Sequence, residues 1–580
     1  MNGTQWIIFI LIIQIIHFLG TWKLYVKAGR KAWEAAVPIY NAIVLMQIIN
    51  RPKWWVFLLF IPIINLLMFP VIWVETLRSF GKNSFIDTWL AILTLGLYIY
   101  YVNYFEDVTY IENRDIHPKT ALGEWVSSIV FAIVAATLVH TYLIQPFVIP
   151  TSSLEKTLLV GDFLFVSKFH YGARIPMTTV AAPMVHDTLP ILRTRSYVAD
   201  VDPATYKTSI WNKLQLPYMR FPGFKEIKRN DIVVFSWPAD TVYQFFKKQE
   251  GVRKPIDKKS NYVKRAVGIP GDSLSIVDGY VYINGKKTVL PYRAKPQFLH
   301  TVTVDGQFSN AAINLLGREN LGGNVIRVPN SSLKQERAEE VVHAMHMDII
   351  KSDSMYTYFA GNIGNSRVRE FLKSEEVGNM ALFNLTEEEA KAYTGKDGIT
   401  AIQKFSYTNK DTTVFPQDVN HPGTVDNMDA IYIPEKGKTV PLDLGVLPIY
   451  EKIIKEYEGN TLQVNGNQIL INGEPANSYT FKQDYYWMMG DNRHRSEDSR
   501  FWGYVPEDHI VGTPVFIWMS IDGINEGIGN WKVRWDRVFT TVGGDGEPVS
   551  YFKYFLMVLA AWFVFDFFRK KKKVGHNSGQ

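Results

Sequence analysis

The chain is organised around the stretch PTSSLEKTLLVGDF, which runs from Pro150 to Phe163. This stretch begins a few residues after an apolar run, Trp125–Leu143, that has the length of a membrane span. Its Ser153 is therefore expected just outside the lipid. A lone serine in such a position usually caps a helix or a turn, and only rarely is it a nucleophile. Other parts of the chain have to decide between these two roles.

Composition divides the chain into apolar ends and a more polar centre. Residues 1–150 and 551–580 are markedly apolar, whereas the centre is rich in Gly, Pro, Asp and Lys. The formal net charge of +6 is small for 580 residues and gives no reason to expect a nucleic-acid partner. There is no cysteine, which excludes disulfides, thiolate catalysis and cysteine-ligated zinc, and leaves the redox compartment open.

Apolar runs predict several membrane spans in the N-terminal part of the chain. We predict spans at Thr4–Leu19, Trp54–Val74, Asp87–Val102 and Trp125–Leu143. Trp33–Ile49 is also apolar, but it is interrupted by a proline and is expected to lie along the membrane interface.

Basic residues predict how these spans are oriented. The segment from Lys23 to Lys53 carries six basic residues and one acid, which is typical of a cytoplasmic loop. If it is cytoplasmic, four spans place everything after Leu143 on the extracytoplasmic face. Near the other end, Tyr551–Phe568 followed by the basic cluster Arg569–Lys573 predicts a membrane anchor with a cytoplasmic tail. A helix lying on anionic lipid is the alternative for this segment.

The region between the membrane segments has the pattern of a mainly β domain. Short β-branched or aromatic runs are separated by Gly, Pro, Asn or Asp, which is typical of strands joined by turns. Two runs end in Asn-Gly, at Asn284 and Asn472, and this pair favours a hairpin turn. Helices are expected at Glu336–Ser352, Thr386–Tyr393 and Leu447–Tyr457. Strands are predicted at Asp162–Phe169, Asp231–Trp237, Tyr262–Val267, Leu274–Val277, Tyr280–Ile283, Leu462–Val464, Gln468–Ile471 and Val515–Met519.

Two further motifs supply the partners that a nucleophilic Ser153 needs. NYVKRAVGIPGD runs from Asn261 to Asp272, and GDNRHRSEDSRFWG runs from Gly490 to Gly503. A serine hydroxyl becomes a good nucleophile only when a base takes its proton, and a lysine can be that base only if burial removes its charge. Lys264 lies among apolar neighbours on a predicted strand, which suits a neutral amine. Without the flanking motifs, it would be interpreted as a solvated residue on a strand edge.

In this order the three motifs resemble those of the type I signal peptidases, the membrane-bound Ser/Lys proteases that remove signal peptides from exported proteins. The resemblance covers Phe147–Phe163, Arg229–Phe235, Tyr262–Asp272 and Met488–Gly512, with a weaker match at Val533–Arg537. It implies that Ser153 is the nucleophile and Lys264 the general base. It also implies an oxyanion hole formed by the Ser153 backbone N–H and the Thr151 hydroxyl, and a Ser496 that orients the lysine amine.

The resemblance further implies supporting and substrate-binding residues. An extended peptide is expected to add as a strand beside Asp162–Phe169 or Tyr262–Val267, with small residues in the A-x-A pattern before the cut. The expected partners are signal-peptide-bearing preproteins and the lipid bilayer, with no nucleic acid, no cofactor and no metal. Support is expected from Arg265, Asp491, Asn492, Arg493, Asp498 and Arg500, and substrate-binding walls at Ile149, Pro150, Leu154 and Leu158.

The first motif departs from the family pattern, which reads Ser-Gly-Ser-Met-x-Pro-Thr-Leu. Here Ser152 replaces the glycine before the nucleophile, Leu154 replaces the methionine after it, and Lys156 replaces the proline. Ser152 is therefore a second candidate nucleophile one position out of register, and it ranks below Ser153. The run Leu158–Phe163 aligns without gaps.

Together these features predict a multi-span α-helical membrane region and a mostly-β extracytoplasmic catalytic domain of signal-peptidase-like β fold, with a large mixed α/β insertion. The chain is expected in the bacterial inner membrane, with its catalytic domain on the periplasmic face. The predicted parts are a membrane region with about three spans (1–121), a span (122–146), the first part of the catalytic domain (147–289), the insertion (290–460), the second part of that domain (461–549) and a C-terminal anchor (550–580).

Other interpretations fit the sequence less well. A metal site at His343 and His346 lacks the HExxH motif, and a histidine-based triad using His170 or His494 lacks a GxSxG context. Self-cleaving repressor-type proteases also use Ser and Lys, but they are cytosolic and carry DNA-binding modules. The alternative from a different class is an inactive membrane-anchored binding scaffold with the same fold. The intact motifs argue against it, and Ser153→Ala would separate the two.

Overall fold

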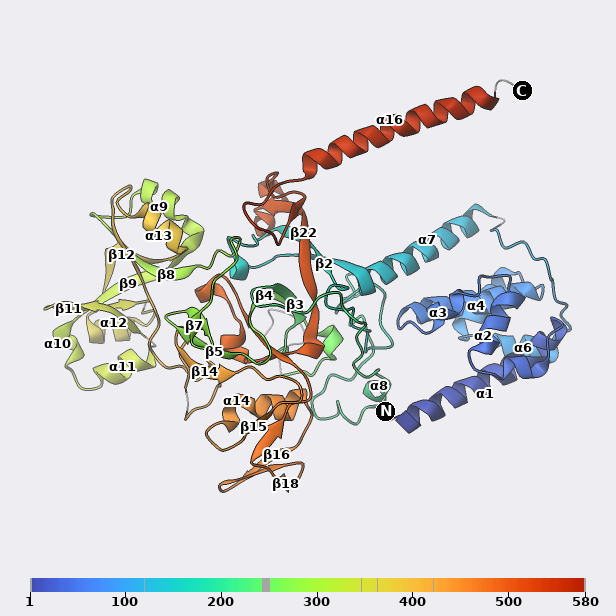
Figure 1. Ribbon diagram of the computed structural model, residues 1–580, viewed down its shortest axis with the longest axis horizontal. Coiled ribbons are helices and arrows are strands. Elements are labelled where there is room, and N and C mark those ends of the chain that lie inside the picture. Colours follow the sequence, from blue (N-terminus) through green and yellow to red (C-terminus); the bar gives the residue numbers. More distant parts are fainter. Residues whose placement is uncertain are drawn as a thin grey trace. The chain divides into compact units, whose positions relative to one another are not determined.

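The computed structural model describes residues 3–118, 120–241, 251–345, 347–361, 363–420 and 422–577. The chain forms two compact units, each built from several segments (Figure 1). The first unit comprises Met1–Gln145, Lys168–Phe224 and Asp240–Ser260. The second comprises Pro146–Ser167, Lys225–Ala239 and Asn261–Gln580, and all three sequence motifs lie in it.

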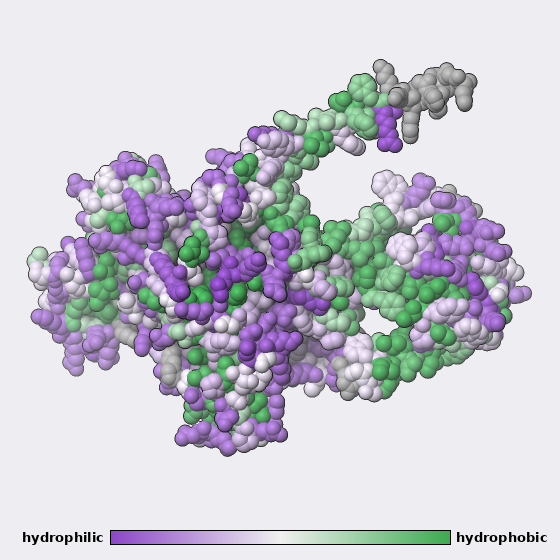
Figure 2. Space-filling view, viewed as in Figure 1, coloured by the Kyte–Doolittle hydropathy of each residue, from purple (hydrophilic) through white to green (hydrophobic). Residues whose placement is uncertain are grey.

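Two helices of the first unit have the length and composition of membrane spans. They are α1, Gly3–Lys27, and α7, Ala121–Leu138, which continues through a π-helical turn to Leu143. No other unbroken helix among the described residues is both long and apolar enough to cross a membrane. Most of their side chains are exposed, and Figure 2 shows the resulting hydrophobic surface. The predicted apolar helices at both places are therefore confirmed.

The predicted span Trp54–Val74 is wrong as a continuous helix. The structure has two helices here, α3 at Trp55–Leu59 and α4 at Ile64–Ser79. Ile63, directly before α4, has a φ of 70°, which an α-helix cannot contain, so the run is broken there. The run Trp33–Ile49 is interrupted as expected, and only its second part forms a regular helix, α2 at Tyr40–Ile48.

The predicted span Asp87–Val102 is also broken. It forms α5, Phe85–Leu93, and α6, Tyr98–Phe105, and the chain direction bends by 119° between the two helices. Gly96 at the bend has a φ of 84°, and a side chain there would lie 2.7 Å from the ring of Trp73. Backbone conformation and close packing therefore bend a run whose apolar composition alone suggested a straight span.

The central sheet of the second unit carries all three motifs. Seven of its strands follow the order β1-β2-β22-β3-β4-β20-β21, and two short strands, β23 and β24, pair with β22. Figure 1 labels β2, β22, β3 and β4 of this sheet. β2, β22, β3, β4 and β20 run antiparallel to their neighbours. The strands are β1 (Ile144–Val148), β2 (Asp162–Ser167), β3 (Ile232–Ser236), β4 (Asn261–Gly268), β20 (Tyr485–Met489), β21 (Val505–Pro506), β22 (Ile510–Asp522), β23 (Lys532–Val533) and β24 (Thr540–Thr541).

Buried β-branched and aromatic residues explain these strands. Val233, Val234 and Phe235 of β3 are almost fully buried, and so are Ala266 and Val267 of β4. Burial on both faces favours the near-continuous apolar runs seen in the sequence. The mainly β prediction for this region is confirmed.

Two Asn-Gly turns form as predicted. Asn284 and Gly285, with φ of 51° and 76°, join β6 (Tyr280–Ile283) to β7 (Lys286–Lys287). Asn472 and the glycine after it, also with positive φ, join β17 (Gln468–Ile471) to β18 (Glu474–Pro475). A type I′ turn needs positive φ at both central residues, and Asn and Gly adopt it at least cost. β6 and β7 belong to a four-stranded sheet with β5 (Ser273–Val277) and β14 (Met428–Tyr432).

A separate six-stranded sheet follows, with the order β10-β11-β9-β12-β8-β13 (Figure 1). Its three apolar clusters consist only of residues between Leu299 and Tyr407. The predicted helix Glu336–Ser352 is only partly correct, because α11 covers Ala338–Ala344 and Asp348–Ser352 forms β10. The other strands are β8 (Phe298–Val304), β9 (Leu321–Pro329), β11 (Tyr356–Ala360), β12 (Glu375–Leu385) and β13 (Ile399–Lys404).

Both remaining predicted helices are confirmed. α13 covers Glu387–Tyr393, and Thr386 closes a capping box with Glu389 at its start. α14 covers Leu447–Lys452 and continues as a π-helical segment to Tyr457. The limits 290 and 460 for an insertion stay a prediction.

The C-terminal apolar run forms a long helix, α16, over Phe552–Asn577. Its most apolar eighteen residues still include Lys553, Asp566 and Arg569, and it is not one of the two span-like helices. The predicted C-terminal anchor therefore stays a prediction.

Candidate active site

Ser153 lies on a short 3-10 helix, Ser152–Leu154, that directly follows the extended residue Thr151. Leu154 and Leu158 anchor this turn, because both are almost fully buried in an apolar cluster with residues of β2, β3 and β22. Between them the chain reverses at Lys156, whose φ is 70°. A proline, with φ fixed near −65°, cannot adopt this conformation. The replacement of the family's proline by Lys156 therefore goes together with a backbone conformation that proline does not allow.

Lys264 lies on β4, opposite Val233 of β3, and its side chain reaches Ser153. The Lys264 Nζ atom is 2.7 Å from the Ser153 Oγ atom, within hydrogen-bond distance. Both side chains are buried, with exposed fractions of 4% and 6%. Burial lowers the pKa of Lys264 to about 8, although the nearby carboxylates of Asp498 and Glu497 oppose this shift. An amine with this pKa is largely neutral slightly above pH 8.

Two buried ion pairs surround this amine. Arg265 donates two hydrogen bonds to Asp491, at 2.8 and 2.6 Å. Arg500 likewise donates two, both at 2.9 Å, to Asp498. Burial raises the pKa of each aspartate, but the paired arginine more than reverses this, so both pKa values lie below the usual range. Both carboxylates are therefore charged and already occupied by their own partners.

The third motif contacts the Ser153 turn through its backbone. Asn492 donates its N–H to the Ser153 carbonyl at 3.1 Å and its side-chain amide to the Ser152 carbonyl at 3.2 Å. Gly490 lies in the same place, and a Cβ atom there would stand 2.6 Å from the Ser153 carbonyl and 2.2 Å from the Ser496 hydroxyl. Arg493 bonds to the Gly490 carbonyl at 3.1 Å. The motif therefore fits the turn too closely for any residue larger than glycine at position 490.

Two residues with expected roles stand less close to the reacting pair. The Ser496 hydroxyl is buried and is not hydrogen-bonded to the Lys264 amine, whereas it helps to lower the pKa of Asp498. Thr151 is exposed and its side chain does not cap the 3-10 helix. Their predicted roles stay predictions.

Most of the residues predicted to form substrate-binding walls are buried. Pro150 is exposed, but Ile149, Leu154 and Leu158 have exposed fractions of 3% or less and support the turn from inside. Both sides of β2 are taken by β1 and β22, which excludes peptide addition at Asp162–Phe169 in this conformation. β20 pairs only with the second half of β4, and no strand of the described chain covers Asn261–Lys264 on that side. Among the described residues, this half of β4 is the edge available to a further strand.

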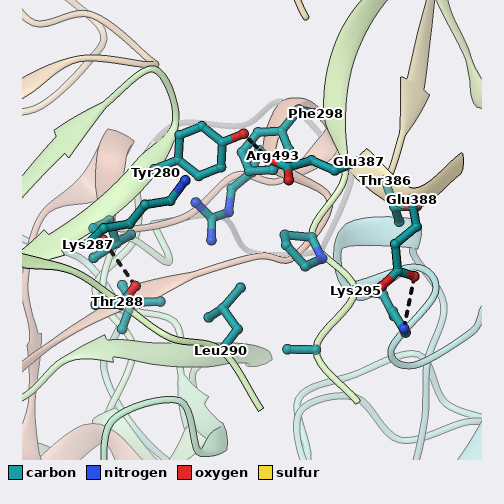
Figure 3. A pocket seen from close by; sticks show the side chains of 14 residues that line it. Tyr280, Lys287, Thr288, Leu290, Lys295, Phe298, Thr386, Glu387, Glu388 and Arg493 are labelled. Atoms are coloured by element: carbon teal, nitrogen blue, oxygen red, sulfur yellow. Dashed lines mark hydrogen bonds and ion pairs between the residues drawn. The ribbon is translucent and has the colours of Figure 1, made fainter. Parts of the chain in front are cut away.

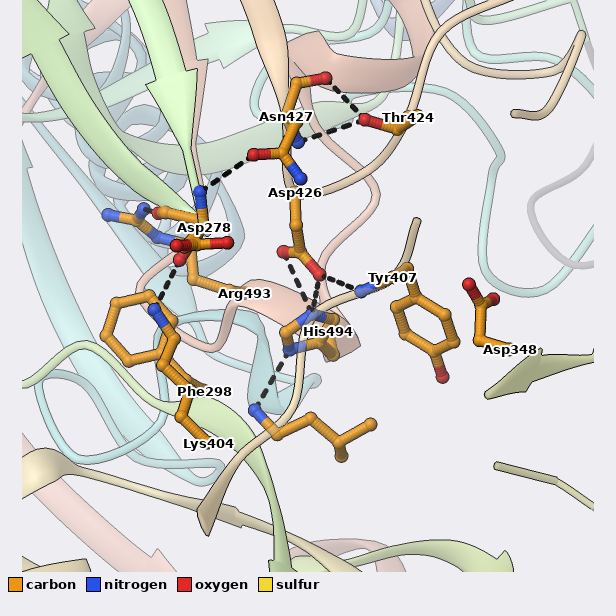
Figure 4. A network of polar contacts seen from close by, with 12 residues as sticks. Asp278, Phe298, Asp348, Lys404, Tyr407, Thr424, Asp426, Asn427, Arg493 and His494 are labelled. Carbon is orange, nitrogen blue, oxygen red and sulfur yellow. Dashed lines mark hydrogen bonds and ion pairs between the residues drawn. The ribbon is translucent and has the colours of Figure 1, made fainter. Parts of the chain in front are cut away.

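His494 in the third motif pairs with Asp426, and not with Ser153. His494 Nε2 lies 2.9 Å from a carboxylate oxygen of Asp426, and its Nδ1 accepts a hydrogen bond from the Leu299 N–H at 3.1 Å (Figure 4). With both ring nitrogens engaged, His494 is not placed to act as the base of a histidine triad. For the rival metal site, His346 lies outside the described residues, and so does the side chain of His343.

A cavity of about 250 Å³ lies beside the third motif. Arg493 and Phe298 line it together with residues of β6, β7 and α13, and the Arg493 guanidinium points into it (Figure 3). Burial lowers the pKa of Arg493 to about 10. Neither this cavity nor the contacts of α13 and Asp426 can be predicted from the sequence, because nothing in the motifs points to their distant partners.

Comparison with protein families yields two matches. A family of unknown function, DUF5684, matches residues 33–113. A family described as signal peptidase, peptidase S26, matches residues 122–318 and 427–519, which together make up half of the chain. Residues 319–426, which hold most of the six-stranded sheet, are not part of that match.

Individual relatives carry the name signal peptidase I. The protein of Rickettsia massiliae (strain Mtu5) is 29% identical over 169 residues, which cover 29% of this chain but only 45% of that relative's length. That of Buchnera aphidicola subsp. Acyrthosiphon pisum (strain APS) is 22% identical, covering 75% of this chain and 90% of the relative. That of Helicobacter pylori (strain ATCC 700392 / 26695) is 23% identical, covering 73% and 92%. With the family match over half of its length, the chain belongs to the signal peptidase family, peptidase S26.

Proposed function

We propose that this chain is a membrane-bound serine endopeptidase that removes N-terminal signal peptides from exported proteins. Ser153 is the nucleophile and Lys264, in its neutral form, is the general base. The observation that carries the proposal is the 2.7 Å contact between the two side chains in a buried setting that lowers the lysine pKa to about 8. The family match and the names of the relatives support the reaction class.

The proposed reaction has two stages. In the first, the Ser153 Oγ atom attacks the carbonyl carbon before the cut while Lys264 takes the hydroxyl proton, which gives a tetrahedral oxyanion. Lys264 then donates that proton to the leaving amine, the C–N bond breaks, and the signal peptide remains as an ester on Ser153. In the second stage a water molecule gives its proton to Lys264 and attacks the ester. The ammonium then returns the proton to Ser153 as the ester breaks.

Burial lowers the pKa of Lys264, and the two neighbouring ion pairs limit how far the nearby carboxylates oppose this. A free carboxylate beside the amine would favour its charged form. Asp498 is close enough to act in this way, but its charge is offset by the two hydrogen bonds from Arg500 and a third from the Gly490 N–H. The effect of burial therefore prevails, and the pKa of the amine is about 8.

The oxyanion is assigned to the Ser153 backbone N–H and the Thr151 hydroxyl. Hydrogen-bond donors aimed at the developing charge typically contribute most of the stabilisation in acyl transfer. The exposed position of Thr151 leaves its hydroxyl accessible to a bound substrate. Thr151→Val keeps the shape of the side chain and removes the hydrogen-bond donor. It is therefore expected to lower kcat by a larger factor than it changes KM.

Substrate binding is assigned to the available half of β4, Asn261–Lys264. A signal peptide added there as a strand brings its carbonyl to Ser153, since Lys264 is part of the same strand. Small residues at the first and third positions before the cut fit beside the packed turn that carries Leu154. The partners are then preproteins whose apolar segment is still in the bilayer, and the catalytic unit works at the extracytoplasmic face of the bacterial inner membrane.

Cleavage of an exported precursor in detergent tests the proposal. The full-length chain is expected to release the mature protein, whereas Ser153→Ala and Lys264→Met are expected to leave only background cleavage. Ser152→Ala is the matched control, because it removes the neighbouring hydroxyl that has no contact with Lys264 among those described. Near-normal turnover by either of the first two variants would overturn the assignment. A precursor that binds but is never cut by the wild type would support the inactive scaffold instead.

A further inference from the structure

α13 contacts the motif-bearing part of the second unit through three consecutive glutamates. The helix belongs to the segment 319–426 that the family match leaves out. Two of the contacts cross the rim of the cavity beside the third motif (Figure 3). The three pairs are Glu387 with the Tyr280 hydroxyl, Glu388 with Lys295 at 3.2 Å, and Glu389 with Lys156 at 2.8 Å.

The third contact differs from the others because Lys156 belongs to the turn that carries Ser153. It lies three residues after Ser153, at the position where the backbone reverses with positive φ. The next residue, Thr157, donates a hydrogen bond to Asp491 at 2.6 Å. The turn is thus held on one side by Asp491 and on the other by Glu389.

Charge, and not apolar packing, joins α13 to this turn. In the described part of the chain, the apolar clusters of the six-stranded sheet contain only its own residues, and the cavity lies between α13 and parts of β6 and β7. Burial lowers the pKa of Lys156, but the hydrogen bond and charge of Glu389 more than reverse this, so the pKa is raised. The pKa of Glu389 is shifted down, since Lys156 and Thr386 outweigh the effect of burial. Both groups are therefore charged at neutral pH.

The third motif is attached to the same sheet at the start of β8. The Gln297 N–H donates to the Asp491 carbonyl at 2.8 Å, and the Arg493 N–H donates to the Gln297 carbonyl at 3.1 Å. Two residues further on, Leu299 binds His494, which pairs with Asp426 (Figure 4). One sheet therefore holds both the Ser153 turn and the motif that packs against it.

We propose that Lys156 and Glu389 are positioning residues, whose ion pair keeps the Ser153 turn in register with Lys264. The six-stranded sheet is then a brace for the reaction, and not an independent module. This inference rests on the proposed peptidase function. It predicts that loss of the ion pair slows the chemical step at saturating substrate, because the hydroxyl and the amine are less often at reacting distance.

Steady-state kinetics on a signal-peptide substrate test this, using the full-length chain in detergent. Glu389→Gln and Lys156→Met are each expected to lower kcat about fivefold or more, with KM within about twofold. The double variant is expected to be no slower than either single variant, since both remove the same contact. The exchanged pair, K156E with E389K, is expected to recover part of the lost kcat. Glu388→Gln is the matched control on the same helix, and it is expected to keep wild-type kcat.

Three outcomes would overturn the inference. One is a Glu389→Gln variant with the kcat of the Glu388→Gln control. Another is a double variant whose losses multiply. The third is a fall in kcat that follows a matching fall in melting temperature with no recovery in the exchanged pair, which indicates a purely structural contact. Absence of cleavage by the wild type would instead refute the proposed function, so the two failures are distinguishable.

Discussion

At the scale of single residues, the setting of Lys264 combines burial with carboxylates that are already neutralised. Asp491 and Asp498 both lie near the amine, yet each accepts two hydrogen bonds from its own arginine. An arginine fork matches a carboxylate in both geometry and charge, so the pairing weakens the effect of these two carboxylates on the lysine. They still raise the pKa of Lys264, but burial has the larger effect and lowers it to about 8.

The pKa of Lys264 sets the expected pH dependence. Because only the neutral amine accepts a proton, kcat/KM is expected to fall about tenfold for each pH unit below the pKa of about 8. Above that pH it is expected to level off. A profile of kcat/KM from pH 5.5 to 9.5 on one precursor measures this. An activity that stays constant down to pH 6 would contradict an amine base with this pKa.

Asp498 offers a stability prediction. Asp498→Asn leaves the Arg500 guanidinium buried without a carboxylate partner, which typically costs about 3–5 kcal/mol of unfolding free energy. Chemical denaturation of the full-length chain in detergent measures the change. The control is Glu451→Gln, because the pair Glu451–Lys455 is about half exposed and is expected to change stability by less than about 0.5 kcal/mol. Equal effects of both variants would show that burial of the first pair carries no particular weight.

The sequence predicted those parts of the site that lie within continuous motifs. Ser153, Lys264 and the two aspartates stand in runs whose order and spacing are specific, and the structure brings them together. The pair Lys156–Glu389 was not predictable, because its members are 233 positions apart and one of them replaces a proline. Burial of Leu154 and Leu158 was equally hidden, since an apolar residue beside a site fits a substrate wall and a core position alike.

At the scale of elements, strands were predicted better than membrane helices. Buried runs such as Ile232–Ser236 are short, β-branched and bounded by turn residues, so composition alone distinguishes them. The broken pair α5–α6 has the composition of a span, and both breaks, in α3–α4 and in α5–α6, fall at residues with positive φ. Ile63 and Leu95 are not residues that usually signal such a conformation.

The available edge of β4 gives a prediction at this scale. A peptide added to an antiparallel strand points alternate backbone N–H groups toward it, so only every second amide makes a hydrogen bond. Methylation of one such substrate amide is expected to raise KM about two- to tenfold, as expected for one lost hydrogen bond. Methylation of either neighbouring amide is expected to have much less effect. A series of substrates methylated one amide at a time measures this, and equal effects along the series would contradict strand addition.

At the scale of the whole molecule, orientation depends on whether the number of membrane crossings is even or odd. If the basic segment Lys23–Lys53 is cytoplasmic, an even number of crossings places the residues after Leu143 outside. If the two helices with the length and composition of spans, α1 and α7, both cross, they give two crossings. A complete crossing by α5 and α6 would make three and place Ser153 on the cytoplasmic side. The 119° bend lets the two helices enter and leave on one side, so we infer that they do not cross.

Labelling of single cysteines tests this topology. The chain has no cysteine of its own, so each introduced thiol gives an unambiguous signal with a membrane-impermeant maleimide. With two crossings, Ser331→Cys, in the short helix Asn330–Leu333 that follows β9, is expected to react in cells whose outer membrane has been made permeable. Lys31→Cys and Asn83→Cys, in the segments before α2 and before α5, are expected to react only after lysis. Reaction of Asn83→Cys in unlysed cells would restore the four-span arrangement. Failure of Ser331→Cys to react before lysis would refute the extracytoplasmic placement, because that thiol lies on an exposed part of the catalytic unit.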